Sequence, residues 1–177
     1  MGSKYVFKVI LTGDAAVGKT AALHKFVKNE FKESYQLTIG AEFLKKELKF
    51  KKDSANLIIW DIAGQKRFES VRKNFYKNAA GSLLLFDLTR PDTFTNLDNW
   101  IKEINENAGP IPFILIGNKA DLVEMVGRTI DPQETKKYAE ERNSIYIETS
   151  AKTGENLEEA FKELTRRMAL AKGKKIK

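Results

Sequence analysis

The chain has 177 residues, 42% of them hydrophobic, a net charge of +7 and no cysteine. This length suits one domain that buries its own core, and the lack of cysteine excludes disulfides, cysteine-ligated zinc and a cysteine nucleophile. No run of about 18 apolar residues occurs, so the sequence predicts no membrane-spanning segment and a cytoplasmic location is expected.

The first predicted strand, at 5–13, leads directly into the loop GDAAVGKT at 13–20, and a helix is predicted at 19–29. A strand before and a helix after are the context that the phosphate-binding loop with this glycine–lysine–threonine spacing requires. The loop N–H groups would cradle phosphates, Lys19 would reach the β- and γ-phosphates, and the Thr20 hydroxyl would bind Mg²⁺. The spacing does not distinguish ATP from GTP, and a structural glycine turn with an exposed lysine is the alternative.

Strands and helices continue to alternate along the chain. Apolar runs that end in glycine or polar residues predict strands at 41–52, 55–64, 82–89, 112–121 and 144–152. Apolar residues at spacings of three and four predict helices at 92–109, 131–142 and 156–171. We expect Asp92 and Asp131 to cap the first two of these helices.

The lysine-rich run 41–52 has the alternation of an exposed strand near a sheet edge, and we expect it to pair antiparallel with its neighbour. The order of elements predicts an α/β fold with a mostly parallel, six-stranded sheet, one antiparallel strand and about five helices.

Polar residues follow the fifth and sixth predicted strands, where ligands of such a sheet bind. Asp121, in the run NKAD at 118–121, can accept two N–H bonds from guanine, a pair that adenine does not supply. In ETSAK, at 148–152, the Ala151 N–H is offered to guanine O6. The alternative is a plain polar loop at a strand end. The residues expected around the base are Asn118, Lys119, Asp121, Leu122, Ser150, Ala151 and Lys152.

The positive charge is concentrated in residues 166–177, RRMALAKGKKIK, which contain six Lys and Arg and no acid. The rest of the chain is close to neutral, so we expect no nucleic-acid partner. We expect one domain at 1–171 and a solvated basic tail at 172–177 that makes at most weak peripheral contact with anionic membranes.

Taken together, these motifs resemble a Ras-superfamily small GTPase, closest in pattern to the Rab branch. TIGAEF at 38–43 is similar to the Rab sequence TIGVDF, and WDIAGQKRF at 60–68 is similar to WDTAGQERF. NLDNWIKEI at 96–104 and ETSAKTGENLEEAF at 148–161 are also Rab-like, and the resemblance covers residues from about 4 to 170. It implies the three-layer P-loop fold of small G proteins, with GTP, GDP and Mg²⁺ as ligands.

The resemblance also implies two switch segments. Residues 29–41 match switch I, where Phe31 would pack on the guanine edge and Tyr35 would cover the phosphates. Thr38 would bind Mg²⁺ through its hydroxyl and the γ-phosphate through its N–H. A plain core role is the alternative for Phe31.

DIAGQ, at 61–65, matches the start of switch II. Asp61 would hold Mg²⁺ through water, and the Gly64 N–H would bind the γ-phosphate. Gln65 would orient the attacking water, with an exposed loop amide as the alternative. Trp60 is expected in the core, and His24 is expected to be structural or exposed.

The full set of implied site residues has three parts. The catalytic residues are Gln65, Lys19 and Thr38. The metal ligands are Thr20, Thr38 and, through water, Asp61. The remaining nucleotide-binding residues, besides those named for the base, are Gly13, Asp14, Ala15, Ala16, Val17, Gly18, Ala21, Phe31, Tyr35 and Gly64.

The sequence departs from the Rab pattern in three places. Ala15 and Ala16 stand in the phosphate loop where the family often has glycine, and a positive φ at Ala16 would cost about 1 kcal/mol. Lys66 replaces a glutamate beside Gln65, and the basic tail lacks the cysteines that carry prenyl groups in Rab proteins.

The leading hypothesis is a GTP/GDP switch of Rab-like traffic or signalling, monomeric, with effectors, an exchange factor and a GTPase-activating protein as partners. Because residues 29–37 contain no arginine, we expect slow intrinsic hydrolysis. The alternatives are a nucleotide-bound scaffold that does not cycle, a charge-driven binding module, and an ATP-dependent kinase, against which Asp121 argues.

Overall fold

The computed structural model describes residues 2–177, whose sheet has the order β2-β3-β1-β4-β5-β6. The strands are β1 (Lys4–Thr12), β2 (Ala41–Lys49), β3 (Ser54–Ile62), β4 (Gly81–Asp87), β5 (Phe113–Asn118) and β6 (Tyr146–Glu148). Neighbouring strands are parallel except for β2 and β3, which are antiparallel. The predicted α/β class is therefore confirmed, and the lysine-rich strand is the edge strand that its alternation indicates.

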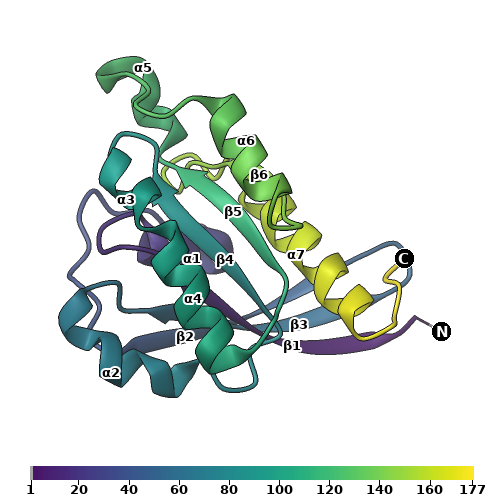
Figure 1. Cartoon of the computed structure of the whole chain (residues 1–177). Helices are drawn as coiled ribbons and strands as arrows, with labels where there is room; N and C mark the ends of the chain where they lie inside the picture. The colour runs from purple at the N-terminus through teal and green to yellow at the C-terminus, as the bar shows by residue number, and fades with distance from the viewer. Residues whose placement is uncertain (1) are drawn as a thin grey trace.

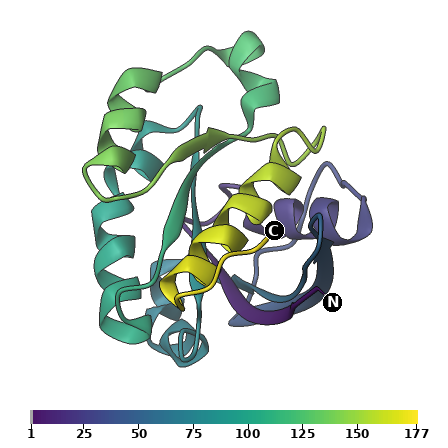
Figure 2. The ribbon, with the colours of Figure 1, turned by 90° about the vertical axis from the view of Figure 1, so that its right-hand side faces the viewer.

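Helices cover both faces of the sheet and make the fold three layers deep, as Figures 1 and 2 show from two directions. The helices are α1 (Lys19–Lys28), α2 (Glu69–Arg72), α3 (Pro91–Thr95), α4 (Leu97–Ala108), α5 (Val123–Val126), α6 (Pro132–Glu140) and α7 (Leu157–Ala171). Three short 3₁₀ turns lie at Lys66–Phe68, Lys73–Phe75 and Ala120–Leu122.

The alternation of side chains along β4 explains how one strand serves both layers. Leu83 and Leu85 belong to the core that α1 and α7 cover, where Phe26 and Phe161 stack with ring centroids 3.9 Å apart. Leu84 and its neighbours of the same parity belong to the opposite core, which α4 and α6 cover. The core is thus built on both faces, while the carboxyl ends of the strands are left for a site.

The predicted helix at 92–109 is two helices, because Asn96 interrupts it between α3 and α4. The predicted cap is also wrong: Pro91 is the first residue of α3, and Arg90 precedes it. Proline is favoured at that position because its ring presets the helical φ and it has no N–H to satisfy. At α6 the prediction is confirmed, since Asp131 accepts a hydrogen bond from the Gln133 N–H at 2.8 Å.

The basic tail differs from the expected solvated helix end, because it folds back onto the β2–β3 turn. Ile176 is only 8% exposed, and the Lys177 N–H donates to Asp53 Oδ2 at 2.7 Å. The other Asp53 carboxylate oxygen accepts from the Ser3 N–H at 2.7 Å, so the two ends of the described chain lie close together (Figures 1 and 2). The lysine side chains of this segment remain exposed.

Candidate functional site

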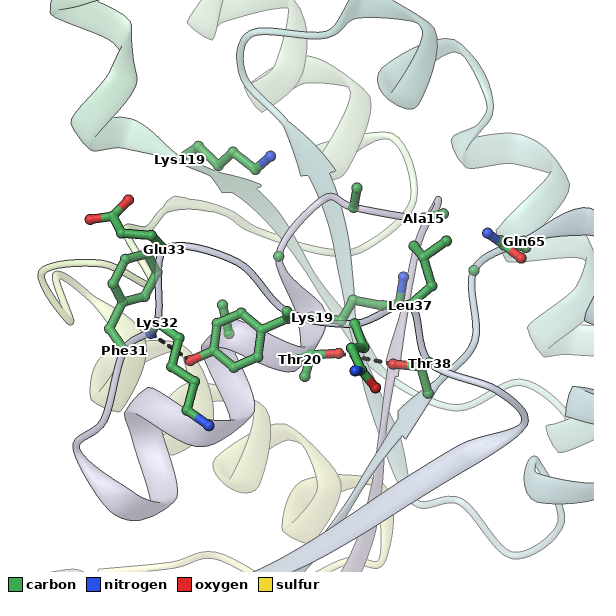
Figure 3. Close-up of a pocket in the computed structure, with 16 residues that line it drawn as sticks. Ala15, Lys19, Thr20, Phe31, Lys32, Glu33, Leu37, Thr38, Gln65 and Lys119 are labelled. Carbon is green, nitrogen blue, oxygen red and sulfur yellow. Dashed lines mark hydrogen bonds between the residues drawn. The ribbon is translucent and has the colours of Figure 1, made fainter.

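The loop between β1 and α1 wraps around the ammonium of Lys19. Its Nζ donates to the carbonyl oxygens of Gly13 and Asp14 at 2.6 and 2.8 Å, and Lys19 is only 5% exposed. Burial lowers the pKa of Lys19 to about 8, although the nearby charges of Asp61 and Asp14 favour its protonated form. The sequence therefore folds the motif lysine into the loop, with its amine aimed across the loop opening (Figure 3).

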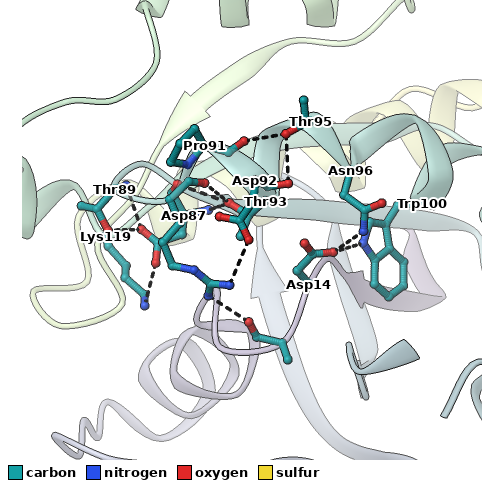
Figure 4. Close-up of polar contacts among 12 residues, drawn as sticks. Asp14, Asp87, Thr89, Pro91, Asp92, Thr93, Thr95, Asn96, Trp100 and Lys119 are labelled. Atoms are coloured by element: carbon teal, nitrogen blue, oxygen red, sulfur yellow. Dashed lines mark hydrogen bonds and ion pairs between the residues drawn. The ribbon is translucent and has the colours of Figure 1, made fainter. Parts of the chain in front are cut away.

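The side chain of Asp14 turns away from this loop and toward the helices of the opposite layer. Its Oδ1 accepts from Asn96 Nδ2 at 2.6 Å and from Trp100 Nε1 at 2.7 Å, as Figure 4 shows. Arg90 adds a bond from Nη1 to the Ala15 carbonyl oxygen at 3.1 Å. The loop is thus tied to α3 and α4, and only the main chain of Asp14 is free for the nucleotide-binding role that the sequence predicts.

Ala16 has a φ of 64°, in the left-handed region. The positive φ considered for Ala16 from the sequence is therefore present, and the backbone is strained there because the residue carries a Cβ. Ala15 has no positive φ, so its methyl group carries no such strain.

Three oxygen-bearing side chains converge beside the loop. The hydroxyls of Thr20 and Thr38 lie 3.0 Å apart, and both donate to Asp61 Oδ2. Burial raises the pKa of Asp61, against the opposing effects of Lys19 and the two hydroxyls. The other carboxylate oxygen, Oδ1, is buried and has no hydrogen-bond partner among residues 2–177.

This cluster fits a magnesium ion shared with a phosphate. Mg²⁺ takes oxygen ligands, keeps several waters and is usually held by one or two carboxylates plus phosphate oxygens. Thr20, Thr38 and Asp61 supply two hydroxyls and one carboxylate with an unsatisfied oxygen. The described residues hold no group of three or more His, Cys, Asp or Glu side chains that suits a metal, so an all-carboxylate or thiolate site is not present there.

Switch II begins against the loop. A Cβ on Gly64 would lie 2.5 Å from the Ala15 nitrogen and the Gly13 oxygen, so only glycine fits this approach. The Gln65 side chain accepts from Arg67 Nε at 2.6 Å, while its carbonyl oxygen accepts from Arg72 Nη1 at 2.8 Å.

These elements line a cavity of about 250 Å³ (Figure 3). Gln65 lies at one end of it, and Phe31 and Lys119 lie at the other. Phe31 packs partly on the core of α1 and α7 and also lines the cavity, so its ring contributes to the core and is accessible to a ligand. Tyr35 also lines the cavity, and its hydroxyl accepts from the Lys32 N–H at 3.0 Å.

A second cavity, of about 180 Å³, adjoins the first and shares Gly18, Phe31 and Lys119 with it. Asp121 lines this cavity, and its Oδ1 accepts from Ser150 Oγ at 2.7 Å, which leaves Oδ2 for another donor. The Ser150 hydroxyl thereby fixes the carboxylate toward the cavity.

Asn118, which lines the second cavity, joins the loop at 13–20 to the segment that follows β6. It is fully buried, and its Nδ2 donates to the Val17 carbonyl oxygen at 2.9 Å. Its Oδ1 accepts from Thr149 Oγ1 at 3.0 Å and from the Ala151 N–H at 3.3 Å. The long Ala151 bond is weak, so that N–H can also serve a ligand.

Most of the predicted site residues therefore meet in one groove. Those that line the two cavities are Ala15, Ala16, Gly18, Lys19, Thr20, Ala21, Phe31, Tyr35, Thr38, Gly64, Gln65, Asn118, Lys119, Asp121, Leu122, Ala151 and Lys152. Those that lie behind its wall are Gly13, Asp14, Val17, Asp61 and Ser150.

The sequence reading missed an aromatic surface beside the switches. Phe43, Trp60 and Phe75 pack in series with tilted rings, whose centroids lie 4.7 and 5.4 Å apart. Trp60 is partly buried and packs against the core beside Tyr76, in agreement with its expected core role. Ile39, which is 78% exposed, lies in the switch I segment 29–41, just before β2. Apolar residues at exposed positions of an edge strand were the available signal.

His24 has a partner that its sequence neighbours do not reveal. Its Nε2 lies 3.1 Å from Glu42 Oε1 on β2, and its ring meets Tyr35 edge to face at 5.6 Å between centroids. The expected structural role fits this position, which joins α1 to switch I.

Comparison with known proteins agrees with this geometry. Residues 8–170 match the sequence model of the Ras family. Ras-related protein RABA1b of Arabidopsis thaliana is 41% identical over 161 residues, 90% of this chain and 74% of the relative. Ras-related protein RABG3f of the same plant is 41% identical over 162 residues, 88% of this chain and 79% of the relative.

Proposed function

The chain belongs to the Ras family and is Rab-like, and from this premise we propose that it is a switch that binds GTP and GDP with Mg²⁺ and slowly hydrolyses GTP. One observation carries the proposal. A single groove joins the phosphate loop, both switch segments and the Asp121 carboxylate. Its two ends are suited to a triphosphate and to guanine.

Guanine selectivity is assigned to Asp121. With Oδ1 bonded to Ser150, the carboxylate faces the cavity and can accept the N1 and N2 protons of guanine. Adenine lacks that donor pair and would leave a partly buried carboxylate unpaired, which costs far more than a hydrogen bond contributes. The Lys119 stem and Phe31 flank the base, and the Ala151 N–H serves its O6 atom.

The triphosphate end supplies the chemistry. Lys19 balances charge on the β- and γ-phosphates, and loop N–H groups of residues 13–20 bind the other phosphate oxygens. Thr20, Thr38 and Asp61 would hold Mg²⁺, which when bound neutralises charge on the phosphates. Gln65 orients the water that attacks the γ-phosphorus, and the Gly64 N–H binds the γ-phosphate.

Hydrolysis is slow because two features oppose it. Switch I has no arginine to stabilise the developing charge, and the Gln65 amide is bonded to Arg67. Acceleration therefore needs an activating protein that supplies charge and releases the Gln65 side chain.

Output is assigned to the surface formed by switch I, switch II and the packed rings of Phe43, Trp60 and Phe75. Thr38 and Gly64 report the γ-phosphate, and the exposed apolar side chains beside them bind an effector. We place this output in Rab-like membrane traffic or signalling, with the protein itself a monomer. The exposed lysines of residues 172–177 give weak contact with an anionic membrane surface. No helix among residues 2–177 is long and apolar enough to cross a membrane.

A non-cycling scaffold remains the second candidate, favoured by the strained Ala16 and by the Arg67–Gln65 bond. It predicts bound guanine nucleotide that is neither exchanged nor hydrolysed. A time course of hydrolysis separates the two candidates.

The binding half of the proposal is tested by chromatography of the nucleotide released from denatured protein. We expect guanine nucleotide from the wild type. Asp121→Ala should lose the preference for GDP over ADP in competition, because the acceptor for the guanine N–H pair is gone. Glu124→Ala, an exposed acid on the neighbouring helix, is the matched control and should keep the preference. Adenine nucleotide, or no nucleotide after loading with GDP and Mg²⁺, would refute the proposal.

A further inference from the structure

We propose that Arg72 is a positioning residue for hydrolysis, which fixes the main chain of Gln65 through a buried guanidinium. The inference rests on the proposed function, in which Gln65 orients the attacking water. Arg72 lies at the end of α2, is only 5% exposed and does not line the nucleotide groove. Its position beneath switch II, rather than contact with phosphate, is what assigns the role.

The guanidinium contacts switch II directly. Arg72 Nη1 donates to the Gln65 carbonyl oxygen at 2.8 Å, and the Phe68 N–H donates to the same oxygen at 3.0 Å. Two donors use both lone pairs of that carbonyl, which fixes the peptide plane at the start of the 3₁₀ turn. The Gln65 side chain is held separately, by the exposed Arg67. The amide can therefore turn toward the groove while its main chain stays in place.

The guanidinium is itself held from the opposite side by α4. Arg72 Nε and Nη2 donate to the two carboxylate oxygens of Glu103, each at 2.7 Å, in a bidentate pair. Tyr76 donates its hydroxyl to Glu103 Oε1 at 2.8 Å. Glu103 is 8% exposed and Tyr76 is fully buried, so these bonds are largely shielded from water.

Trp100 connects this arrangement to the phosphate loop. The Arg72 guanidinium carbon lies 4.4 Å from the centre of the Trp100 ring, and the indole N–H donates to Asp14 (Figure 4). One helix, α4, thus holds both the loop that binds the phosphates and the segment that places the water. Gln65 must sit within a fraction of an ångström of its working position relative to the γ-phosphate, and this common anchor fixes that spacing.

The fork of arginine is required by this geometry. The guanidinium bonds on two sides at once, with two N–H groups to Glu103 and one to Gln65. A lysine ammonium in the same place is a point charge on a flexible stem and does not hold both partners. Removing Arg72 alone would leave Glu103 buried and unpaired, so a test variant should remove both charges together.

The test is single-turnover hydrolysis by GTP-loaded protein, measured together with the dissociation rates of GTP and GDP. We expect Arg72→Met/Glu103→Leu to lower the hydrolysis rate about tenfold or more while both dissociation rates stay within about twofold. Arg72→Lys should give a smaller loss of at least about threefold. Lys73→Met/Glu69→Leu, which removes the partly exposed 3.0 Å pair between α2 and the 3₁₀ turn that follows it, is the matched control and should leave the rate unchanged.

The same substitutions in a Gln65→Leu background show whether Arg72 acts through Gln65. There the loss should disappear, because no amide remains to be positioned. A rate within about twofold of wild type, an equal loss in the Gln65→Leu background, or a parallel rise in nucleotide dissociation would each overturn the inference. If the double variant does not fold, Arg72→Lys decides by the same criteria. Absence of GTP hydrolysis in the wild type would instead refute the proposed function.

Discussion

At the scale of single residues, Ala16 shows that the phosphate loop contains a strained backbone conformation. Its φ of 64° places a Cβ where glycine is favoured, at a cost of about 1–2 kcal/mol. The neighbouring Ala15 has no such strain. Replacing each of these neighbouring alanines by glycine should therefore change the stability of the folded protein differently.

We expect Ala16→Gly to be more stable than Ala15→Gly by about 1 kcal/mol, since both add the same flexibility to the unfolded chain but only Ala16→Gly relieves strain. The measurement is urea unfolding of both variants at one fixed concentration of GDP and Mg²⁺, because bound ligand adds to stability. Equal stability, or a more stable Ala15→Gly, would show that Ala16 is not strained in solution.

The residue scale also shows what spacing in a sequence reveals. The way the phosphate loop folds around Lys19 could be predicted, because the contacts of Lys19 with Gly13 and Asp14 are local. Asp14 could not be read in the same way, since its partners Asn96 and Trp100 are 82 and 86 residues away. The partner of His24, Glu42, was hidden for the same reason. Contacts between residues close in the sequence can be predicted from it, whereas side-chain partners far apart in the sequence are determined by the complete fold.

At the scale of elements, the short strand β6 makes few strand hydrogen bonds, and an ion pair at Glu148 stabilises it. Arg128, beyond α5, donates from two nitrogens to Glu148 at 2.5 and 2.7 Å, and Tyr146 donates to the same carboxylate at 2.6 Å. The Arg128 hydrogen bonds hold the pKa of Glu148 below its usual value, against the opposing effect of burial. Glu148 immediately precedes the segment that carries Ser150 and Ala151, so the pair stabilises the base end of the groove.

We expect Glu148→Gln to lower the free energy of unfolding by about 1 kcal/mol at pH 7, a modest amount because the pair is partly exposed. The folded-state pKa is lowered, so this contribution is present above the unfolded pKa of about 4.3 and is lost as pH falls through the folded value. The difference between wild type and variant should therefore shrink below pH ~4.3. Chemical unfolding at several pH values measures it.

Glu140→Gln is the control for that series. Glu140 is exposed, and its contact with Lys136 is long, at 3.9 Å, and therefore weak. It should show no such pH-dependent difference. A constant deficit for Glu148→Gln at all pH values would mean that the Arg128 pair does not hold the charged form.

Elements also differ in how well their patterns predicted them. The sheet-edge position of β2 followed from alternation, and the apolar face of α7 followed from helical spacing. The break at Asn96 did not, because apolar residues at spacings of three and four continue across it, from Phe94 to Leu97 and Ile101. Asn96 Nδ2 donates to Asp14, and this tertiary bond at the interruption has no signature in the local sequence.

At the scale of the whole molecule, one helix connects two parts of the site that are far apart in the sequence. Through Trp100 and Glu103, α4 contacts the phosphate loop and switch II, while switch I is anchored by Thr38 near Asp61. The phosphate loop and switch II therefore share one anchor, α4, whereas switch I is attached separately.

The most direct test of this account is a single-turnover time course of GTP hydrolysis by the wild type and by Gln65→Leu. Chromatography of the bound nucleotide monitors the conversion of GTP to GDP. The wild type should convert bound GTP to GDP more slowly than about one turnover per minute, since no arginine acts in cis. Gln65→Leu should be slower by at least about tenfold, because the water is no longer oriented. Unassisted turnover faster than about one per minute, no conversion at all, or equal rates in the two proteins would contradict the account.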